Sequence, residues 1–228
     1  MPRIDRFFVP FENTAPTLTV TDKPLLHQLK RVLRKKAGDA IVFVNEHAQE
    51  ADALISSLSE KEGVFILSGH RTVASESATP LTLCVAVLKR ENTELVIQKA
   101  TELGMAHIIL LETKHTIKKG APLPRLRLIA KEAAEQSGRG RIPSVEYMSF
   151  TRACELFGHN AILLDPSGQA LQKNTSVETI FIGPEGGWHP DELAHAKESG
   201  IAIHNLGARI LRAETAAIIG AAWLSGMF

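Results

Sequence analysis

The chain has 228 residues, of which 44% are hydrophobic, and a mean hydropathy of +0.00, as in a globular protein with one large domain or two modest ones. It contains no apolar run of the roughly 18–20 residues that a membrane span requires, and its N-terminus lacks the apolar core of a signal peptide, so we expect no membrane association. The two cysteines form no CxxC pair and the nine histidines show no HExxH spacing, which favours a reducing cytoplasm and no bound metal.

The first seventy residues predict a β-rich unit with one helix. The stretch "PLLHQLKRVLRKKAGD" predicts a helix that ends at Gly38 and whose apolar face comprises Leu25, Leu26, Leu29, Val32 and Leu33. Strands are predicted in "AIVFVN", "ADALISSL" and "GVFILSG". The small, polar stretch "RTVASESATP" (71–80) is typical of a linker, so we predict domains at residues 1–72 and 73–228.

From Leu81 onwards, apolar strands alternate with amphipathic helices. Strands are predicted in "LTLCVAVL", "AHIILLE", "AILLD", "TIFIG" and "AIHNLG", and helices in "ENTELVIQKATELG", "PRLRLIAKEAAEQSG", "PDELAHAKESG" and "AETAAIIGAAWLSG". This alternation predicts an α/β fold with a mostly parallel sheet covered on both faces. Ligands of such sheets bind at the carboxyl ends of the strands, so we expect a site in the loops after Leu164, Ile182 and Leu206.

The net charge of +1 conceals two basic segments. Residues 23–36 hold six basic and no acidic side chains, and residues 114–141 hold eight basic and two acidic ones. One such segment alone is more often a solvated charged face, but two on a neutral chain favour a polyanion partner such as nucleic acid.

Two glycine-bearing loops follow the late strands. "FIGPEGGWHPDE" (181–192) carries Glu185 among its glycines and has no GxxxxGK[ST] pattern, and no GxGxxG opens the first βα unit, so a phosphate or dinucleotide cradle is disfavoured. In "NLGARILRAETAA" (205–217), apolar Ile210 and Leu211 lie between charged residues. Apolar side chains beside exposed backbone suit a flat heteroaromatic ring, and Glu185 and Glu214 suit a cationic ligand. Taken singly, each loop is equally explained as an ordinary turn.

Together the two loops are more specific. "IGPEGG" followed by "LGARILRAETAA", with "IQKATELG" and "EAAEQSGR" before them, resembles the SPOUT class of methyltransferases. Within that class the chain is similar, from "RFFV" to the last helix, to the family that methylates N3 of a uridine in 16S ribosomal RNA. The resemblance implies an N-terminal PUA-like β-barrel that binds RNA, a C-terminal α/β domain with a deep trefoil knot, S-adenosylmethionine bound in the knot, and a homodimer.

The resemblance also implies site residues. The cofactor-binding residues carried over by position are Leu164, Gly183, Pro184, Glu185, Gly186, Gly187, Leu206, Gly207, Ile210, Leu211, Arg212 and Thr215. Arg212 is expected to stabilise the uracil oxygens as they gain charge, and Glu214 to orient Arg212 or act as the base. The alternatives are a phosphate contact or a salt bridge to Glu214 for Arg212, and a helix-capping carboxylate for Glu214.

RNA contacts are expected from the basic front unit and from residues that match the family pattern: Arg3, Arg6, Lys30, Arg31, Arg34, Lys89, Gln98, Lys99, Glu102 and Arg139. For Lys89, Gln98, Lys99 and Glu102, the alternative is a solvated surface. The sequence departs from the family after "HIILLE", where Thr113–Thr116 replace a frequent Glu-Arg pair, and in "VNEHAQEADA", which lacks an Asp-Gly hairpin.

Two other functions remain open from the sequence. One is a SPOUT methyltransferase acting on another RNA position, such as a ribose 2′-hydroxyl. The other is a non-catalytic RNA-binding protein of ribosome assembly.

Overall fold

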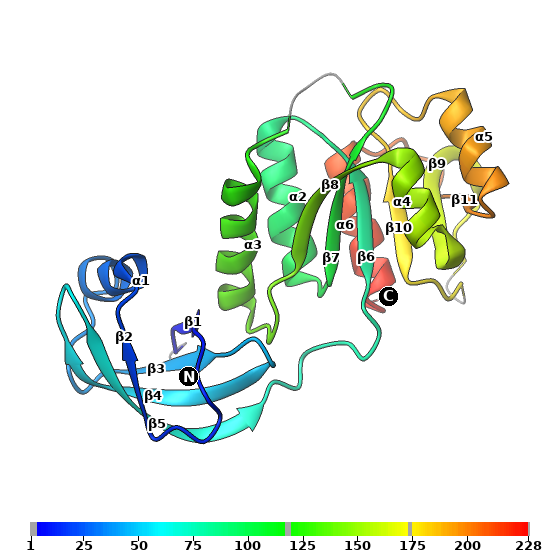
Figure 1. Cartoon of the computed structure of the whole chain (residues 1–228). Coiled ribbons are helices and arrows are strands. Elements are labelled where there is room, and N and C mark those ends of the chain that lie inside the picture. The colour runs from blue at the N-terminus through cyan, green and yellow to red at the C-terminus, as the bar shows by residue number, and fades with distance from the viewer. Residues whose placement is uncertain (1–3, 117–119, 173–174, 228) are drawn as a thin grey trace. The chain divides into compact units, whose positions relative to one another are not determined.

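The computed structural model describes residues 4–116, 120–172 and 175–227 (Figure 1). The chain divides into two compact units. The first unit comprises residues 1–76 and 135–141, and the second comprises residues 77–134 and 142–228.

The first unit is built on a curled five-stranded sheet of order β1-β3-β4-β5-β2, in which only β1 and β3 run parallel. Its strands are β1 Arg6–Phe8, β2 Thr17–Val20, β3 Ala40–Val44, β4 Gln49–Leu58 and β5 Gly63–Thr72. Phe43 and Phe65 are fully buried and meet edge to face, with ring centroids 4.7 Å apart. This aromatic pair anchors the core of the sheet.

The helical segment of the first unit is shorter than the sequence predicted. It consists of α1 Lys23–His27 and a π-helical turn, Gln28–Val32. Arg34 has a φ of 55°, so the chain leaves the helix there and not at Gly38. Val32 is 64% exposed, so its prediction as part of the buried face was wrong, whereas Leu25, Leu26 and Leu29 are buried. The shift from α to π geometry rotates Val32 away from the face that the 3.6-residue period assigns to it.

The second unit is built on a six-stranded sheet of order β11-β9-β10-β6-β7-β8, and all of its strand pairs are parallel. Its strands are β6 Thr82–Ala86, β7 His107–Glu112, β8 Ser144–Ser149, β9 Ala161–Ala170, β10 Thr179–Ile182 and β11 Ala202–Asn205. The central strands β6 and β10 are buried along their whole length, which explains their uninterrupted apolar sequences.

Helices cover both faces of this sheet (Figure 1). On one face lie α2 Arg90–Glu102, α3 Leu123–Ser137 and α6 Ala213–Leu224, and on the other lie α4 Phe150–Phe157 and α5 Pro190–Glu198. A single 3₁₀ turn, Gly158–Asn160, leads from α4 into β9. The predicted α/β alternation is therefore confirmed, while β1, β2 and β8 were not predicted.

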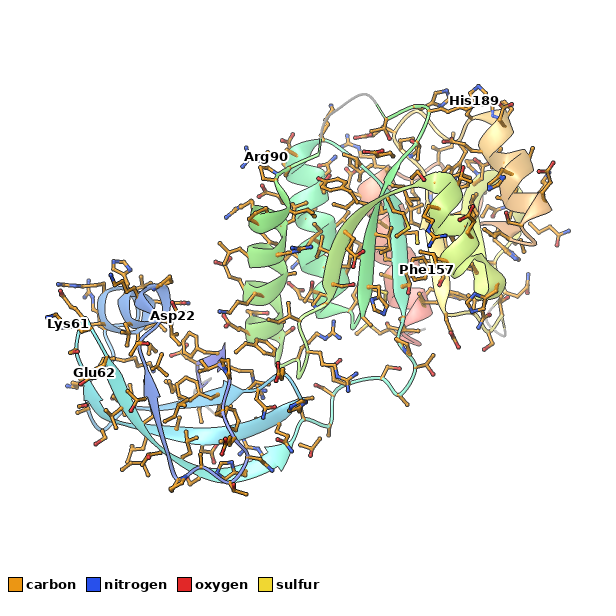
Figure 2. The ribbon with its side chains drawn as sticks, in the orientation of Figure 1. Asp22, Lys61, Glu62, Arg90, Phe157 and His189 are labelled. Atoms are coloured by element: carbon orange, nitrogen blue, oxygen red, sulfur yellow. The ribbon has the colours of Figure 1, made fainter. Side chains whose placement is uncertain are left out.

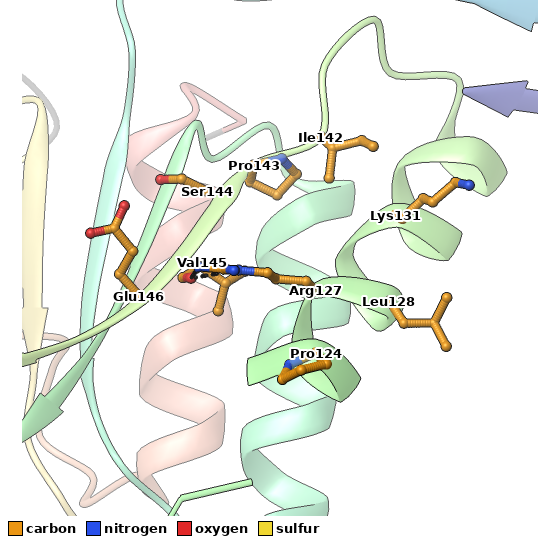
Figure 3. A pocket seen from close by; sticks show the side chains of 9 residues that line it. All are labelled: Pro124, Arg127, Leu128, Lys131, Ile142, Pro143, Ser144, Val145 and Glu146. Atoms are coloured by element: carbon orange, nitrogen blue, oxygen red, sulfur yellow. Dashed lines mark hydrogen bonds between the residues drawn. The ribbon is translucent and has the colours of Figure 1, made fainter. Parts of the chain in front are cut away.

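The edge strand β8 lies beside a hollow of about 550 Å³ between this strand and α3 (Figure 3). The Arg127 guanidinium crosses from α3 and donates to the Val145 carbonyl, with both N···O distances at 3.4 Å. An arginine over an unpaired strand carbonyl protects the sheet edge from pairing with another chain. None of the described helices is long and apolar enough to cross a membrane.

Candidate functional site

The β10–α5 loop, residues 183–189, forms one side of the site. Gly187 has a φ of 73°, which allows the sharp reversal before α5. Trp188 is buried and its Nε1 donates to the Leu164 carbonyl at 3.0 Å, so the loop is tied to the buried part of β9. A Cβ on Gly183 would lie 3.0 Å from the Trp188 ring, so this position accepts a larger residue only if the indole moves.

The β11–α6 loop forms the opposite side. Asn205, at the end of β11, donates from Nδ2 to the Gly168 carbonyl at 2.6 Å and accepts from the Gly207 amide at 2.9 Å. These bonds turn the chain away from the sheet before α6 begins at Ala213. Ile210 is 87% exposed, an unusual position for a large apolar side chain.

A cavity of about 900 Å³ lies between the two loops, at the carboxyl ends of β9, β10 and β11. Its apolar lining comes mainly from Leu164, Ile182, Trp188, Leu206 and Leu211. Its charged lining consists of three carboxylates and three cations: Asp165, Glu185, Glu214, Lys89, Arg209 and Arg212. A cavity of this size with an apolar wall and a few convergent charges suits a small ligand that has both a flat ring and charged groups.

The structure brings together ten of the twelve residues predicted to bind the cofactor. The lining includes Leu164, Gly183, Pro184, Glu185, Gly187, Leu206, Gly207, Ile210, Leu211 and Arg212. Gly186 and Thr215 are not part of it. Sequence reasoning missed Asp165, Trp188 and Asn205. Asn205 ends β11, and Asp165 ends the strand "AILLD" that the sequence predicted, so their polar side chains at these positions were a signal that could have identified them.

The two residues predicted to be catalytic both line the cavity at the start of α6. Arg212 is the N-cap residue of α6, and Glu214 lies in its first turn. Within the described part of the chain, Arg212 makes no ion pair with Glu214, so the predicted salt bridge between them does not form in this structure. A carboxylate in the first turn is also favoured by the helix dipole, so the capping alternative for Glu214 stands.

The residues predicted to contact RNA are distributed over both units. Lys89 lines the cavity, and its backbone amide donates to Glu185 at 3.4 Å. Gln98, Lys99 and Glu102 lie on α2, where Lys99 Nζ is 2.8 Å from Glu102. In the first unit, Arg31 and Arg34 are exposed, Lys30 is half-buried, and Arg3 lies outside the described residues.

Two of these arginines hold the first unit together instead of facing solvent. Arg6 is mostly buried and pairs with Glu50, which also pairs with Arg71. Arg139 is 5% exposed and grips Glu76 with two bonds, Nε–Oε1 at 3.2 Å and Nη2–Oε2 at 2.7 Å. Burial alone would raise the pKa of Glu76, but Arg139 and the amides of Gly140 and Arg141 outweigh it and lower that pKa. Arg139 is therefore largely withdrawn from solvent, and its role as an RNA contact stays a prediction.

Comparison with known proteins agrees with this site. A family model described as an RNA methyltransferase domain matches residues 75–225. The Ribosomal RNA small subunit methyltransferase E of Rickettsia conorii is 32% identical over 204 residues, which cover 85% of this chain and 83% of that protein. The protein of the same name from Synechocystis is 31% identical over 225 residues, covering 92% of this chain and 73% of that one.

A solved structure also matches the whole chain. It is a Ribosomal RNA small subunit methyltransferase E from Neisseria gonorrhoeae bound to S-adenosyl methionine, with a TM-score of 0.89 and 26% identity, covering 99% of this chain and 98% of that one. The predicted resemblance and fold class are thus confirmed, while the knotted path of the C-terminal segment stays a prediction. The chain belongs to the RNA methyltransferase family, in the group of the small-subunit ribosomal RNA methyltransferases E.

Proposed function

We propose that this protein transfers a methyl group from S-adenosylmethionine to N3 of a uridine in 16S ribosomal RNA. The observation that carries the proposal is the single cavity formed by the two glycine-bearing loops. Its apolar wall suits adenine, and its carboxylates Asp165, Glu185 and Glu214 suit the sulfonium and ammonium groups of the methyl donor. When bound, S-adenosylmethionine supplies a methyl group activated by the sulfonium charge.

The residues at the start of α6 carry the chemistry in this proposal. N3 of uridine must lose its proton before it attacks a methyl carbon, and the uracil oxygens then gain negative charge. The Arg212 guanidinium stabilises that charge, and Glu214 either orients Arg212 or accepts the N3 proton. Lys30, Arg31 and Arg34 of the first unit, proposed here as a PUA-like RNA-binding domain, hold the RNA through its phosphates.

We also propose a homodimer that works in the cytoplasm, where small subunits are assembled. Ile210, which is 87% exposed at the rim of the cavity, offers a large apolar side chain for a partner subunit to cover. Light scattering after size-exclusion chromatography measures the oligomeric state, and a strictly monomeric protein would contradict this part.

The test is methyl transfer from labelled S-adenosylmethionine to unmethylated small subunits, with the product nucleoside identified and mapped by mass spectrometry. We expect N3-methyluridine at one position, and a loss of at least about 100-fold in transfer rate for Arg212→Ala while cofactor binding persists. Methylation of a ribose or another base would overturn the substrate. Cofactor binding without transfer to any subunit would favour the assembly protein.

A further inference from the structure

A compact turn, Thr113–Thr116, follows β7. The Thr113 carbonyl accepts the Thr116 amide at 3.1 Å, and Thr116 Oγ1 accepts the Thr113 amide at 3.1 Å and lies 2.7 Å from Thr113 Oγ1. These bonds place Lys114 and His115 at the tip of a closed turn. The backbone of Lys114 and His115 is therefore held in place by the turn.

This turn is fastened to the β10–α5 loop, which lies beyond β6 in the sheet order. The Lys114 amide donates to Glu192 Oε1 at 2.9 Å, while Glu192 Oε2 accepts the His189 amide at 2.9 Å. Glu192 is only 6% exposed, so this carboxylate bridges the two segments from a buried position. The Lys114 ammonium also pairs with Asp191 at the surface.

His115 makes the contact closest to the cavity. Its Nδ1 is 2.9 Å from the Gly187 carbonyl oxygen, and its ring meets the His189 ring with centroids 5.6 Å apart at 68°. A carbonyl oxygen can only accept, so Nδ1 carries the proton and donates it. Figure 2 labels His189 at the start of α5, where this contact lies.

The position of His115 separates it from the cavity itself. Gly187 lines the cavity, whereas His115 does not. A Cβ built on Gly186 would lie 3.4 Å from the His115 Cβ, so His115 packs against Gly186, a residue of the loop that does not line the cavity. Two hydrogen bonds thus hold the loop: Trp188 donates to Leu164, and His115 donates to Gly187.

We propose that His115 is a positioning residue, which holds the Gly183–Gly187 loop in the shape that binds S-adenosylmethionine. The proposal rests on the proposed function, since it assigns that cofactor to the cavity. An asparagine Nδ2 can donate the hydrogen bond that His115 Nδ1 donates. The variant His115→Asn therefore retains the donor, and His115→Ala removes it. His159 is the matched control, because it is an exposed histidine in the turn before β9, at the amino end of that strand, whereas His115 follows the carboxyl end of β7.

The first test measures the affinity for S-adenosylmethionine by calorimetry on the full-length variants. We expect His115→Ala to weaken binding about three- to tenfold, His115→Asn to stay within about twofold of the wild type, and His159→Ala to match the wild type. In the transfer assay, the loss for His115→Ala should appear in KM for the cofactor and not in kcat at saturation. Equal affinity of His115→Ala and wild type would overturn the proposal, as would equal weakening in His115→Ala and His115→Asn.

The second test does not depend on the cofactor. Hydrogen exchange of the free protein should be faster over residues 183–189 in His115→Ala than in wild type, and restored in His115→Asn. Unchanged exchange in His115→Ala would refute the positioning role even if the protein proves to be a methyltransferase. Faster exchange in His115→Ala, together with a wild type that fails to bind S-adenosylmethionine, would instead retain the contact and refute the proposed function together with the cofactor assignment.

Discussion

Trp188 connects the two strands whose ends support the cavity. Its indole Nε1 donates to the carbonyl of Leu164, at the end of the buried part of β9, and the ring packs under Gly183 of the neighbouring loop. The ring also contacts Phe150 of α4, with centroids 5.0 Å apart. One side chain therefore couples the shape of the glycine loop to the core of the sheet.

Replacing Trp188 by Phe removes the only indole donor to Leu164 and leaves a buried carbonyl without that partner. We expect the free energy of unfolding to fall by roughly 1–3 kcal/mol, measured by urea denaturation followed by circular dichroism. Trp223→Phe on α6 is the control, because Trp223 is only partly buried. A Trp188→Phe protein as stable as the wild type would show that this hydrogen bond contributes nothing to the fold.

The close approach of β9 and β11 shapes the other side of the cavity. A Cβ on Gly168 would lie 2.6 Å from backbone atoms of Ile203 and His204, where the register of the two strands shifts. Backbone atoms cannot rotate away as a side-chain tip can, so the strands must separate to admit even a methyl group. The same strands carry Asp165 and Asn205 into the cavity.

We therefore expect Gly168→Ala to lower the free energy of unfolding by roughly 1–3 kcal/mol and to weaken cofactor binding as well. Gly158→Ala is the matched control, since its Cβ would meet the Ile201 side chain at 3.2 and 3.3 Å and the nearest backbone atom only at 4.0 Å. Thermal melts and calorimetric titration of both variants measure the two effects. Equal tolerance of alanine at both glycines would contradict the close strand approach.

The Glu76–Arg139 pair links the segment after β5 to the C-terminal end of α3 within the first unit. The pKa of Glu76 is lower in the folded protein than in the unfolded chain. Its contribution to stability is therefore complete above the unfolded pKa of about 4.5 and is lost as the pH falls through the lower folded value. The pair thus stabilises the first unit at neutral pH and not in acid.

Glu76→Gln should lower the free energy of unfolding by about 1–3 kcal/mol at pH 7, and this difference should shrink below roughly pH 4.5. Urea denaturation at several pH values between 7 and 3 measures it. Glu62→Gln is the control, because Glu62 lies exposed in the β4–β5 turn (Figure 2). A difference between Glu76→Gln and wild type that stays constant down to pH 3 would contradict the lowered pKa.

The elements that sequence reasoning predicted are those with strong local patterns. β6, β7 and β10 are buried on both faces and have continuous apolar sequences, and α2 and α3 show a regular apolar stripe. β8 was missed because it is an edge strand with only Val145 fully buried. The π-helical turn was missed because Leu29 and Val32 are three residues apart, a spacing that would also place both side chains on one face of an α-helix.

The site was predictable to a different degree from the fold. The resemblance located the two loops, and ten of twelve predicted residues line the cavity. What holds those loops depends on contacts between distant segments, such as Lys114 with Glu192 and Trp188 with Leu164, which no local pattern encodes. Arg139 is a further example, because the sequence places it in a basic segment but does not show that it is buried with Glu76.

In the proposed function, the first unit binds RNA and the second binds the cofactor. The residues that line the cavity belong to the second unit, and the exposed cations around α1 belong to the first. Cofactor affinity and RNA affinity should therefore respond to different substitutions. Arg31 is 63% exposed and pairs with Glu60 at the surface, a contact that contributes little to stability, so it is available to a phosphate.

We expect Arg31→Gln combined with Arg34→Gln to weaken binding to small-subunit RNA without changing the affinity for S-adenosylmethionine. Each lost phosphate contact should reduce the slope of log K against log salt concentration by about 0.7–0.9, so the double variant should lose about 1.4–1.8. Filter binding between 50 and 200 mM salt measures the slope. Lys197→Gln, an exposed cation on α5, is the control and should leave the slope unchanged. A wild-type slope in the double variant would show that α1 and its flanking turn are not part of the RNA-binding surface and that the second unit binds the RNA.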